Sequence, residues 1–279
     1  ALGSATAVSS AHVENLASVS ANVHDGAIAA NGQAGGFVGE STASGLADVA
    51  DKDSILNLVK INGLLGAVTY LLPTYTDVDV SFVGEASVKA DSAGGFAGTF
   101  EAGTVDNSTR EEAQQWAVYG IDEVLGGAYA GGFGGNVYSG ALADASKGIS
   151  ILGDISGLEV DVAQLLNLIG AYVPTIKGAG VSSSKRGLKV SATTERDGDS
   201  SSGSAGGFIG CGSGVQISGS NVSVLRSTAV TEPEDLEATE APTYFDDAQS
   251  KYAVTGARYA GGYIGMMNIG SAASVGKGI

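Results

Sequence analysis

The hexamer AGGFVG at Ala34–Gly39 is the strongest indication of the fold, because near-copies of it occur four more times along the chain. Each copy is followed by a loop of three to five residues, a further glycine and a short β-prone stretch. This unit predicts a strand, a tight turn and a second strand, since glycine permits positive φ at turns and close approach of backbones within strands. The further copies are AGGFAG at Ala93–Gly98, AGGFGG at Ala130–Gly135, AGGFIG at Ala205–Gly210 and AGGYIG at Ala260–Gly265.

The spacing of these hexamers indicates how the repeats are arranged. Successive copies are 59, 37, 75 and 55 residues apart in a chain of 279 residues. Helical repeats and propellers keep a tighter period, whereas a β-solenoid tolerates insertions that leave the stack as side excursions. We therefore predict a mainly β protein, a parallel β-solenoid (β-helix) that forms a single elongated repeat domain over residues 1–279. At about 20–30 residues per turn, it would have roughly ten turns.

Two apolar stretches, at about residues 51–73 and 157–174, interrupt the β pattern. Similar lead-ins, GLADVADKDSIL and GALADASKGISIL, precede them, and each stretch ends at a proline, Pro73 or Pro174. In the first stretch, apolar residues between Ile55 and Leu72 recur at spacings of three, four and seven, which is the helical pattern. Its 18 residues reach the length of a membrane span, but its internal polar residues and its shorter duplicate favour a helix packed on the solenoid. We predict two short helical inserts and no membrane insertion.

The last hexamer is followed by GSAASVGKGI, which resembles the start of a further lead-in. We therefore expect this sequence to be a fragment of a longer array. Natural repeat arrays cover their ends with capping repeats, and neither end here resembles one. End-to-end self-association is therefore the expected alternative to continuation of the chain.

Short alternating runs outside the inserts favour half-buried strands. In TDVDVSF, Val78, Val80 and Phe82 fall on one face, while Asp77 and Asp79 fall on the other. Alternation with a period of two is the signal of a strand with one buried face. The central aromatics of the hexamers are expected to form an inward-facing, stacked column, with an exposed stripe that binds sugar rings as the alternative. These structural repeat aromatics are Phe37, Phe96, Phe133, Phe208 and Tyr263.

Composition limits the class of partner. The net charge is −16 and the pI about 4.3, with only 14 lysines and arginines. Nucleic-acid binding needs clustered basic residues, so no nucleic-acid partner is expected. A strong negative charge is typical of a soluble protein that must not aggregate, and it suits an extracellular surface protein. The single cysteine, Cys211, excludes an internal disulfide and a cysteine-based metal site.

The hexamers with their following strands resemble the GLUG-type glycine-rich repeat of bacterial surface proteins. That repeat has Gly-Gly-apolar-Val-Gly, a short loop and Gly-x-Ile, and the sequence here places Phe or Tyr where that family usually has Leu. The resemblance implies β-solenoid turns within a large, secreted, wall-attached protein. It supplies no catalytic residues.

Motifs that carry chemistry are missing from the sequence. His12 and His24 have no metal-binding spacing, and neither a GxSxG elbow nor a phosphate-binding loop occurs. We therefore predict no enzyme activity, no cofactor and no metal centre. Asp197 and Asp199, in RDGDSSSG, are candidate ligands for a weakly bound cation, although a calcium loop of the EF type needs more ligands; a solvated turn is the other interpretation. Asn107 begins an N-x-S/T sequon.

These observations lead to three functional hypotheses. The first is a secreted bacterial cell-surface repeat region that acts as an adhesin or a structural stalk. Its partner would be a glycan or protein on a host or neighbouring cell. The second is a right-handed β-helix enzyme that acts on polysaccharide, for which Lys185, Arg186 and Lys189 are available basic residues. The third is an ice-binding solenoid, which requires regular threonine rows, whereas the threonines are scattered along the sequence.

Overall fold

The computed structural model describes residues 7–43, 72–111, 114–139, 172–184, 186–223 and 251–268. This part is mainly β, and no α-helix occurs among the described residues. Its strands are β1 (Ala7–Ser20), β2 (Val23–His24), β3 (Ala27–Ile28), β4 (Gln33–Gly35), β5 (Val38–Ser41), β6 (Thr74–Gly94), β7 (Ala97–Glu101), β8 (Thr104–Asp106), β9 (Trp116–Ile121), β10 (Glu123–Gly131), β11 (Gly134–Tyr138), β12 (Thr175–Lys177), β13 (Gly180–Ser183), β14 (Gly187–Ala192), β15 (Ser204–Gly206), β16 (Ile209–Ser213), β17 (Gln216–Ser218), β18 (Val222–Ser223), β19 (Lys251–Gly256), β20 (Tyr259–Gly261) and β21 (Ile264–Asn268).

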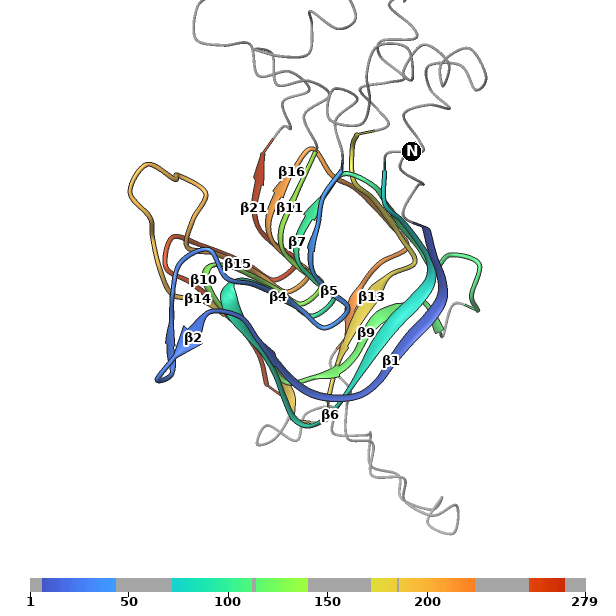
Figure 1. Ribbon diagram of the computed structural model, residues 1–279, viewed down its shortest axis with the longest axis horizontal. Coiled ribbons are helices and arrows are strands. Elements are labelled where there is room, and N and C mark those ends of the chain that lie inside the picture. The colour runs from blue at the N-terminus through green and yellow to red at the C-terminus, as the bar shows by residue number, and fades with distance from the viewer. Residues whose placement is uncertain are drawn as a thin grey trace, which may run out of the picture.

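The strands form parallel sheets. One sheet has 14 strands and a second has five, in the order β21-β16-β11-β7-β5, while β2 and β3 form a small antiparallel hairpin. The pairings define five layers, each paired with the next one along the chain. The first layer is β1 with β4 and β5, the second is β6 and β7, the third is β8 to β11, the fourth is β12 to β16 and the fifth is β17 to β21. Figure 1 shows β5, β7, β11, β16 and β21 side by side, while β1 and β6 curve around the other sides.

The five hexamers lie on one another in register. Ala34 pairs with Ala93, and the same alanine position continues through β10, β15 and β20. After the turn, Val38 pairs with Ala97, and this column continues through β11, β16 and β21. The repeat in sequence is therefore a repeat in space, with one hexamer in each layer.

Glycine is required in the hexamer because the backbones of neighbouring layers nearly touch there. A Cβ added to Gly95 would lie within 3.0 Å of the carbonyl oxygen of Gly132, and one added to Gly132 would lie equally close to that of Gly207. The glycines that follow the loops turn the chain instead. Gly103 has a φ of 85° and Gly214 a φ of 58°, in the left-handed region that glycine adopts without strain.

The five hexamer aromatics form one stack, as the sequence predicts. Adjacent ring centroids are 4.9 to 5.0 Å apart and the planes are inclined by 3 to 19°. The rings of Phe96, Phe133 and Phe208 are fully buried. Phe37 and Tyr263 lie at the two ends of the stack, are partly buried, and pack against the same core. The column therefore faces inward.

The core lies between the hexamer column and the long curved strands. The alternation predicted in β6 is confirmed, because Val78 and Val80 have no exposed surface and Phe82 is 5% exposed. Val80 pairs with Val13 of β1 on one side and with Val118 of β9 on the other, so apolar side chains of successive layers meet inside. Tyr75 packs edge-on against the ring of Phe96 and closes the core beside the stack.

The expected number of turns and the two expected helical inserts both involve residues outside the described part of the chain. The described residues form five layers of up to five strands each, and the expectation of roughly ten turns over residues 1–279 stays a prediction, because the structure describes only part of that range. The aromatic stack is roughly 20 Å long between its end rings. The predicted inserts at 51–73 and 157–174 lie outside the described residues except at 72–73 and 172–174, which are not helical.

Candidate functional site

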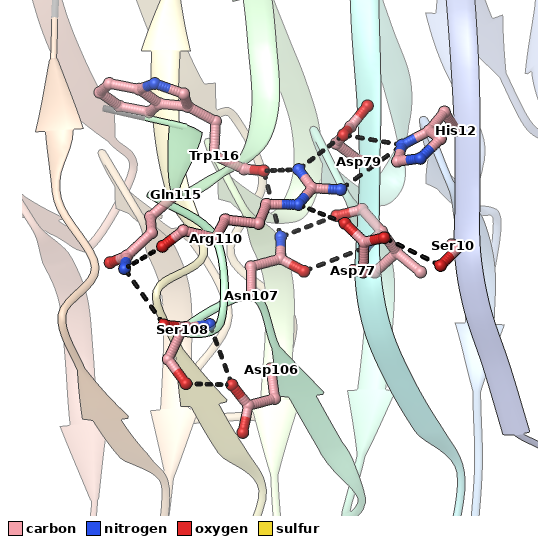
Figure 2. A network of polar contacts seen from close by, with 11 residues as sticks. Ser10, His12, Asp77, Asp79, Asp106, Asn107, Ser108, Arg110, Gln115 and Trp116 are labelled. Atoms are coloured by element: carbon pink, nitrogen blue, oxygen red, sulfur yellow. Dashed lines mark hydrogen bonds and ion pairs between the residues drawn. The ribbon is translucent and has the colours of Figure 1, made fainter. Parts of the chain in front are cut away.

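The side chain of Arg110 connects three layers on the lateral face (Figure 2). Its Nε donates to Asp77 Oδ1 at 2.6 Å and its Nη1 to Asp79 Oδ2 at 2.7 Å, both in the second layer. In the first layer, the Ser10 hydroxyl donates to the other oxygen of Asp77 and His12 Nδ1 lies 2.9 Å from Asp79 Oδ2. The Arg110 side chain is only 13% exposed, so these ion pairs are shielded more than typical surface pairs.

The electrostatics of this cluster favour a structural clamp. The hydrogen bond from Arg110, assisted by that from Ser10, lowers the pKa of Asp77 below its usual value. The Ser10 hydroxyl is directed to Asp77 while His12 contacts Asp79, so these residues do not form the nucleophile–base pair of a catalytic triad. The cluster stabilises the contact of β1 with β6.

Asn107 lies next to this cluster, below Arg110 in the view of Figure 2. It is fully buried. Its amide accepts from Val78 N at 3.0 Å and donates to Val78 O at 2.8 Å and to Trp116 O at 3.1 Å. Between β8 and β9 the chain of the third layer leaves the sheet, so Val78 has no backbone partner there. The Asn107 amide takes the place of that partner. A buried amide with these partners is not available as a glycosylation acceptor, so the sequon at Asn107 serves the fold.

A second polar cluster surrounds Asp91, which is 5% exposed. One carboxylate oxygen accepts from Asn31 N at 2.8 Å and the other from Ala128 N at 3.2 Å. Arg196 forms an ion pair with the same carboxylate. Asp91 therefore ties the β2–β3 excursion of the first layer and the 193–203 excursion of the fourth layer to the sheet.

The candidate cation ligands Asp197 and Asp199 lie in this 193–203 excursion but have different surroundings. Asp199 accepts hydrogen bonds from the Ser201 amide at 3.0 Å, the Ser201 hydroxyl at 2.6 Å and the Tyr129 hydroxyl. Burial alone would raise the pKa of Asp199, but these hydrogen bonds outweigh it and lower the pKa. Asp197 is exposed. The described residues contain no group of three or more His, Cys, Asp or Glu side chains arranged to hold a metal ion, and weak cation binding by this turn stays a prediction.

Of the basic residues available to a polysaccharide-acting enzyme, Lys185 lies outside the described residues, and Arg186 and Lys189 form ion pairs with the preceding layer. Lys189 Nζ lies 3.4 Å from Glu123, which also pairs with Lys89, and Arg186 lies 3.5 Å from Asp122. These pairs form a ladder along the outer face rather than a convergent site. Their basic side chains are 39 to 63% exposed, so each pair contributes little to stability.

One carboxyl group has the environment of a proton donor. Burial, and then the negative charge of Glu40, raise the pKa of Glu101. Tyr138, which pairs with Glu101 in register, has its pKa raised to about 12 by burial and by the two glutamates. A carboxyl group whose pKa is raised by burial and by a second carboxylate shares this feature with general acids.

The register also aligns three threonines that are scattered in sequence. Thr74, Thr104 and Thr175 follow one another in adjacent layers. The neighbouring outward row contains Asp106 and Lys177, which lie 3.9 Å apart as an ion pair. In the described part of the chain this gives one hydroxyl row beside a charged row, and ice binding stays a prediction.

The hydroxyl of Tyr263 decides between the two interpretations of the aromatic column. It donates to the Ser220 carbonyl oxygen at 2.9 Å, and burial raises its pKa to about 12. The polar end of this ring therefore has a protein partner, and the column is a packing element rather than a sugar-binding stripe.

Comparison with models of protein families, with curated proteins and with solved structures found no match. The search for membrane spans found no sufficiently long and apolar helix in the described part of the chain.

Sequence reasoning missed the residues that join the layers, above all Asp91, Arg110 and Asn107. A weak signal was present for Asn107 and Asp77, because small polar residues are favoured at chain corners. The partners of Arg110 and Asp91 carry no such signal, since they come from layers far apart in sequence.

Proposed function

We propose that the chain forms a parallel β-solenoid within a secreted bacterial surface protein and acts as an adhesin or a structural stalk without catalysis. The observation that carries this proposal is the register of the five hexamers, in which each layer pairs with the next one along the chain. Successive turns that stack in chain order are the defining feature of a solenoid.

Three further observations support a load-bearing or binding scaffold. The aromatic stack and the glycine contacts join the layers inside, while the clusters of Arg110 and Asp91 join them outside. The layers differ in their excursions, which leave the stack without breaking its register. The net charge of −16 and the resemblance to GLUG-type repeats favour an extracellular, cell-surface location.

The partner of such a scaffold would be a glycan or a protein on a host or neighbouring cell. Fluorescent beads coated with the chain, with bovine serum albumin as the control coating, would be applied to a glycan array and to cultured cells. Bead retention that free chain competes away is the expected result. Retention equal to that of the albumin beads on every surface would refute the adhesin function, and recovery of the native protein from the cytosol alone would refute the location.

A second candidate function rests on Glu101. Its raised pKa and its neighbour Glu40 favour a polysaccharide-acting enzyme in which Glu101 is the acid. The chain would be incubated with polygalacturonate, chitin and xylan, and released reducing ends and unsaturated products would be measured. Activity that the Glu101→Gln variant loses would establish this function in place of the first. Equal background from both proteins would exclude it for these substrates.

A further inference from the structure

The two ends of the described stack carry similar side chains in the same columns. One column has a valine in every layer, paired in register from β1 to β19: Val19, Val88, Val124, Val190 and Val254. The three inner valines have no exposed surface, whereas the two at the ends are only partly buried. The alanine and aromatic columns of the hexamers also run through all five layers. The first and fifth layers therefore present matching apolar patterns at opposite ends.

Gly262 is a glycine that the described layers alone do not require. In the other four hexamers, a Cβ added to the second glycine would lie within 3.0 Å of the carbonyl oxygen of the equivalent glycine in the next layer; these glycines are Gly36, Gly95, Gly132 and Gly207. Gly262 holds the same position in the fifth hexamer, but a Cβ added to it would have nothing within 4 Å, and its φ is not in the left-handed region. Glycine costs more conformational entropy on folding than any other residue. Its presence here is explained if a further layer of the same kind lies on the fifth.

The backbone hydrogen bonds along the aromatic column all have the same direction. The amide of each aromatic residue donates to the carbonyl oxygen of the aromatic residue in the next layer, from Phe37 N to Phe96 O at 3.0 Å and finally from Phe208 N to Tyr263 O at 2.8 Å. Among the described residues, the N–H of Tyr263 has no acceptor and the C=O of Phe37 has no donor. Unpaired backbone groups at a sheet edge are a template for pairing with another chain. The fifth layer thus offers a donor and the first layer the acceptor that complements it.

We propose that the fifth layer of one copy of the chain binds the first layer of a second copy, so that copies associate head to tail. Tyr263 stacks on Phe37 of the second copy and its N–H donates to the C=O of that residue, while Val254 contacts Val19. The carbonyl oxygen of Gly36 in the second copy then lies on Gly262. These contacts repeat those between neighbouring layers within the chain.

A second copy in this orientation is the occupant that the end layers fit. Two fifth layers facing each other would bring N–H groups against N–H groups, and two first layers would bring C=O groups against C=O groups. Head-to-tail contacts do not close on themselves, so they produce linear assemblies that grow with concentration. The interface uses the ends of the stack, and it goes beyond the adhesin function without depending on it.

The first test measures the mass of the full chain against protein concentration by sedimentation velocity and light scattering. Salt at about 0.15 M screens the repulsion between copies of net charge −16. We expect the mean mass of the wild type to increase steadily with concentration. The methyl group of Gly262→Ala would overlap with the second copy and should weaken association at least about tenfold. In dilute solution its circular dichroism and melting temperature should match those of the wild type, because the methyl group contacts nothing within one copy.

Tyr119→Ala is the matched control, because Tyr119 is 46% exposed but lies in the third layer, which has described layers on both sides. Its association should equal that of the wild type. A wild type that stays monomeric at every concentration would overturn the proposal, and the fifth layer would then be covered by the same chain or by another protein. Association that Gly262→Ala leaves unchanged would overturn it as well.

The second test determines the direction of association by disulfide formation between copies. Val19→Cys and Val254→Cys are prepared as separate proteins, in which the native Cys211 is buried. Paired strands lie about 4.8 Å apart, within the Cα–Cα distance of about 4.4–6.8 Å that a disulfide requires. An equimolar mixture should therefore give a disulfide-linked dimer on a non-reducing gel, and neither protein should do so by itself. Dimers formed by either protein alone, or none in the mixture, would overturn the head-to-tail arrangement.

Discussion

Removal of one ring from the centre of the aromatic stack should destabilise the protein more than removal of an equally buried ring outside it. Phe133 is fully buried and stacks on Phe96 and Phe208, with centroids 5.0 Å away on both sides. Phe133→Leu retains an apolar side chain but loses both ring contacts. At about 0.5–1.5 kcal/mol for each aromatic pair, the lost stacking corresponds to about 1–3 kcal/mol.

Phe100 provides the matched control. It is also fully buried, but its aromatic contact is a tilted one with Tyr75 at 6.0 Å. Phe100→Leu should therefore cost less than Phe133→Leu, by about 1 kcal/mol. Phe133→Ala, which also opens a cavity, should cost about 3–5 kcal/mol.

The assay is urea denaturation at equilibrium, followed by far-ultraviolet circular dichroism and by the fluorescence of Trp116. Coincident transitions from the two probes are needed before a single free energy of unfolding is assigned. If Phe133→Leu costs no more than Phe100→Leu, the stack does not stabilise the layers beyond ordinary burial, and the reasoning is wrong.

Four further predictions concern single positions. Gly132→Ala should destabilise the folded protein by about 3 kcal/mol, because the added methyl group overlaps with the next layer. A Cβ added to Gly262 has nothing within 4 Å, so Gly262→Ala should leave the melting temperature nearly unchanged. Equal effects of the two substitutions would contradict the stacking argument. Asn107→Ala leaves the buried N–H and C=O of Val78 without their side-chain partner, and thermal denaturation should show a loss of about 2–4 kcal/mol; a neutral result would show that Val78 finds other partners. Because Arg110 lowers the pKa of Asp77, the stabilisation from this carboxylate is complete above about pH 4 and is lost as pH falls through the lowered pKa. Asp77→Asn should therefore be less stable than the wild type at neutral pH, and its free energy of unfolding in urea titrations should fall less steeply as the pH is lowered. Parallel pH profiles of the two proteins would oppose this. Burial raises the pKa of the Cys211 thiol to about 11, so Ellman's reagent should modify the native protein far more slowly than the urea-unfolded protein at neutral pH; equal rates would show that the thiol is accessible.

The repeating parts of this protein are predictable from the amino-acid sequence, because their causes are local. Two adjacent glycines and an aromatic residue, repeated five times, predict backbones in close contact and a single aromatic column, and both are present. The alternation of Val78, Val80 and Phe82 predicts their burial, since successive side chains of a strand point to opposite faces. To predict these features, it is enough to know the residue types within a few positions and the rule that similar repeat units stack on one another.

The number of layers that the described residues form, and the polar side chains that join these layers, follow from the tertiary structure and are not predictable from the sequence. A layer of up to five strands uses more residues than a minimal turn, and no residue marks the number of strands. Arg110 meets His12 across 98 residues, and Asp91 meets Asn31 across 60. Such contacts depend on which segments of successive layers pair with one another, with the excursions lying outside the stack. Excursion length does not change the stacking, so spacing along the sequence carries no information about these pairs.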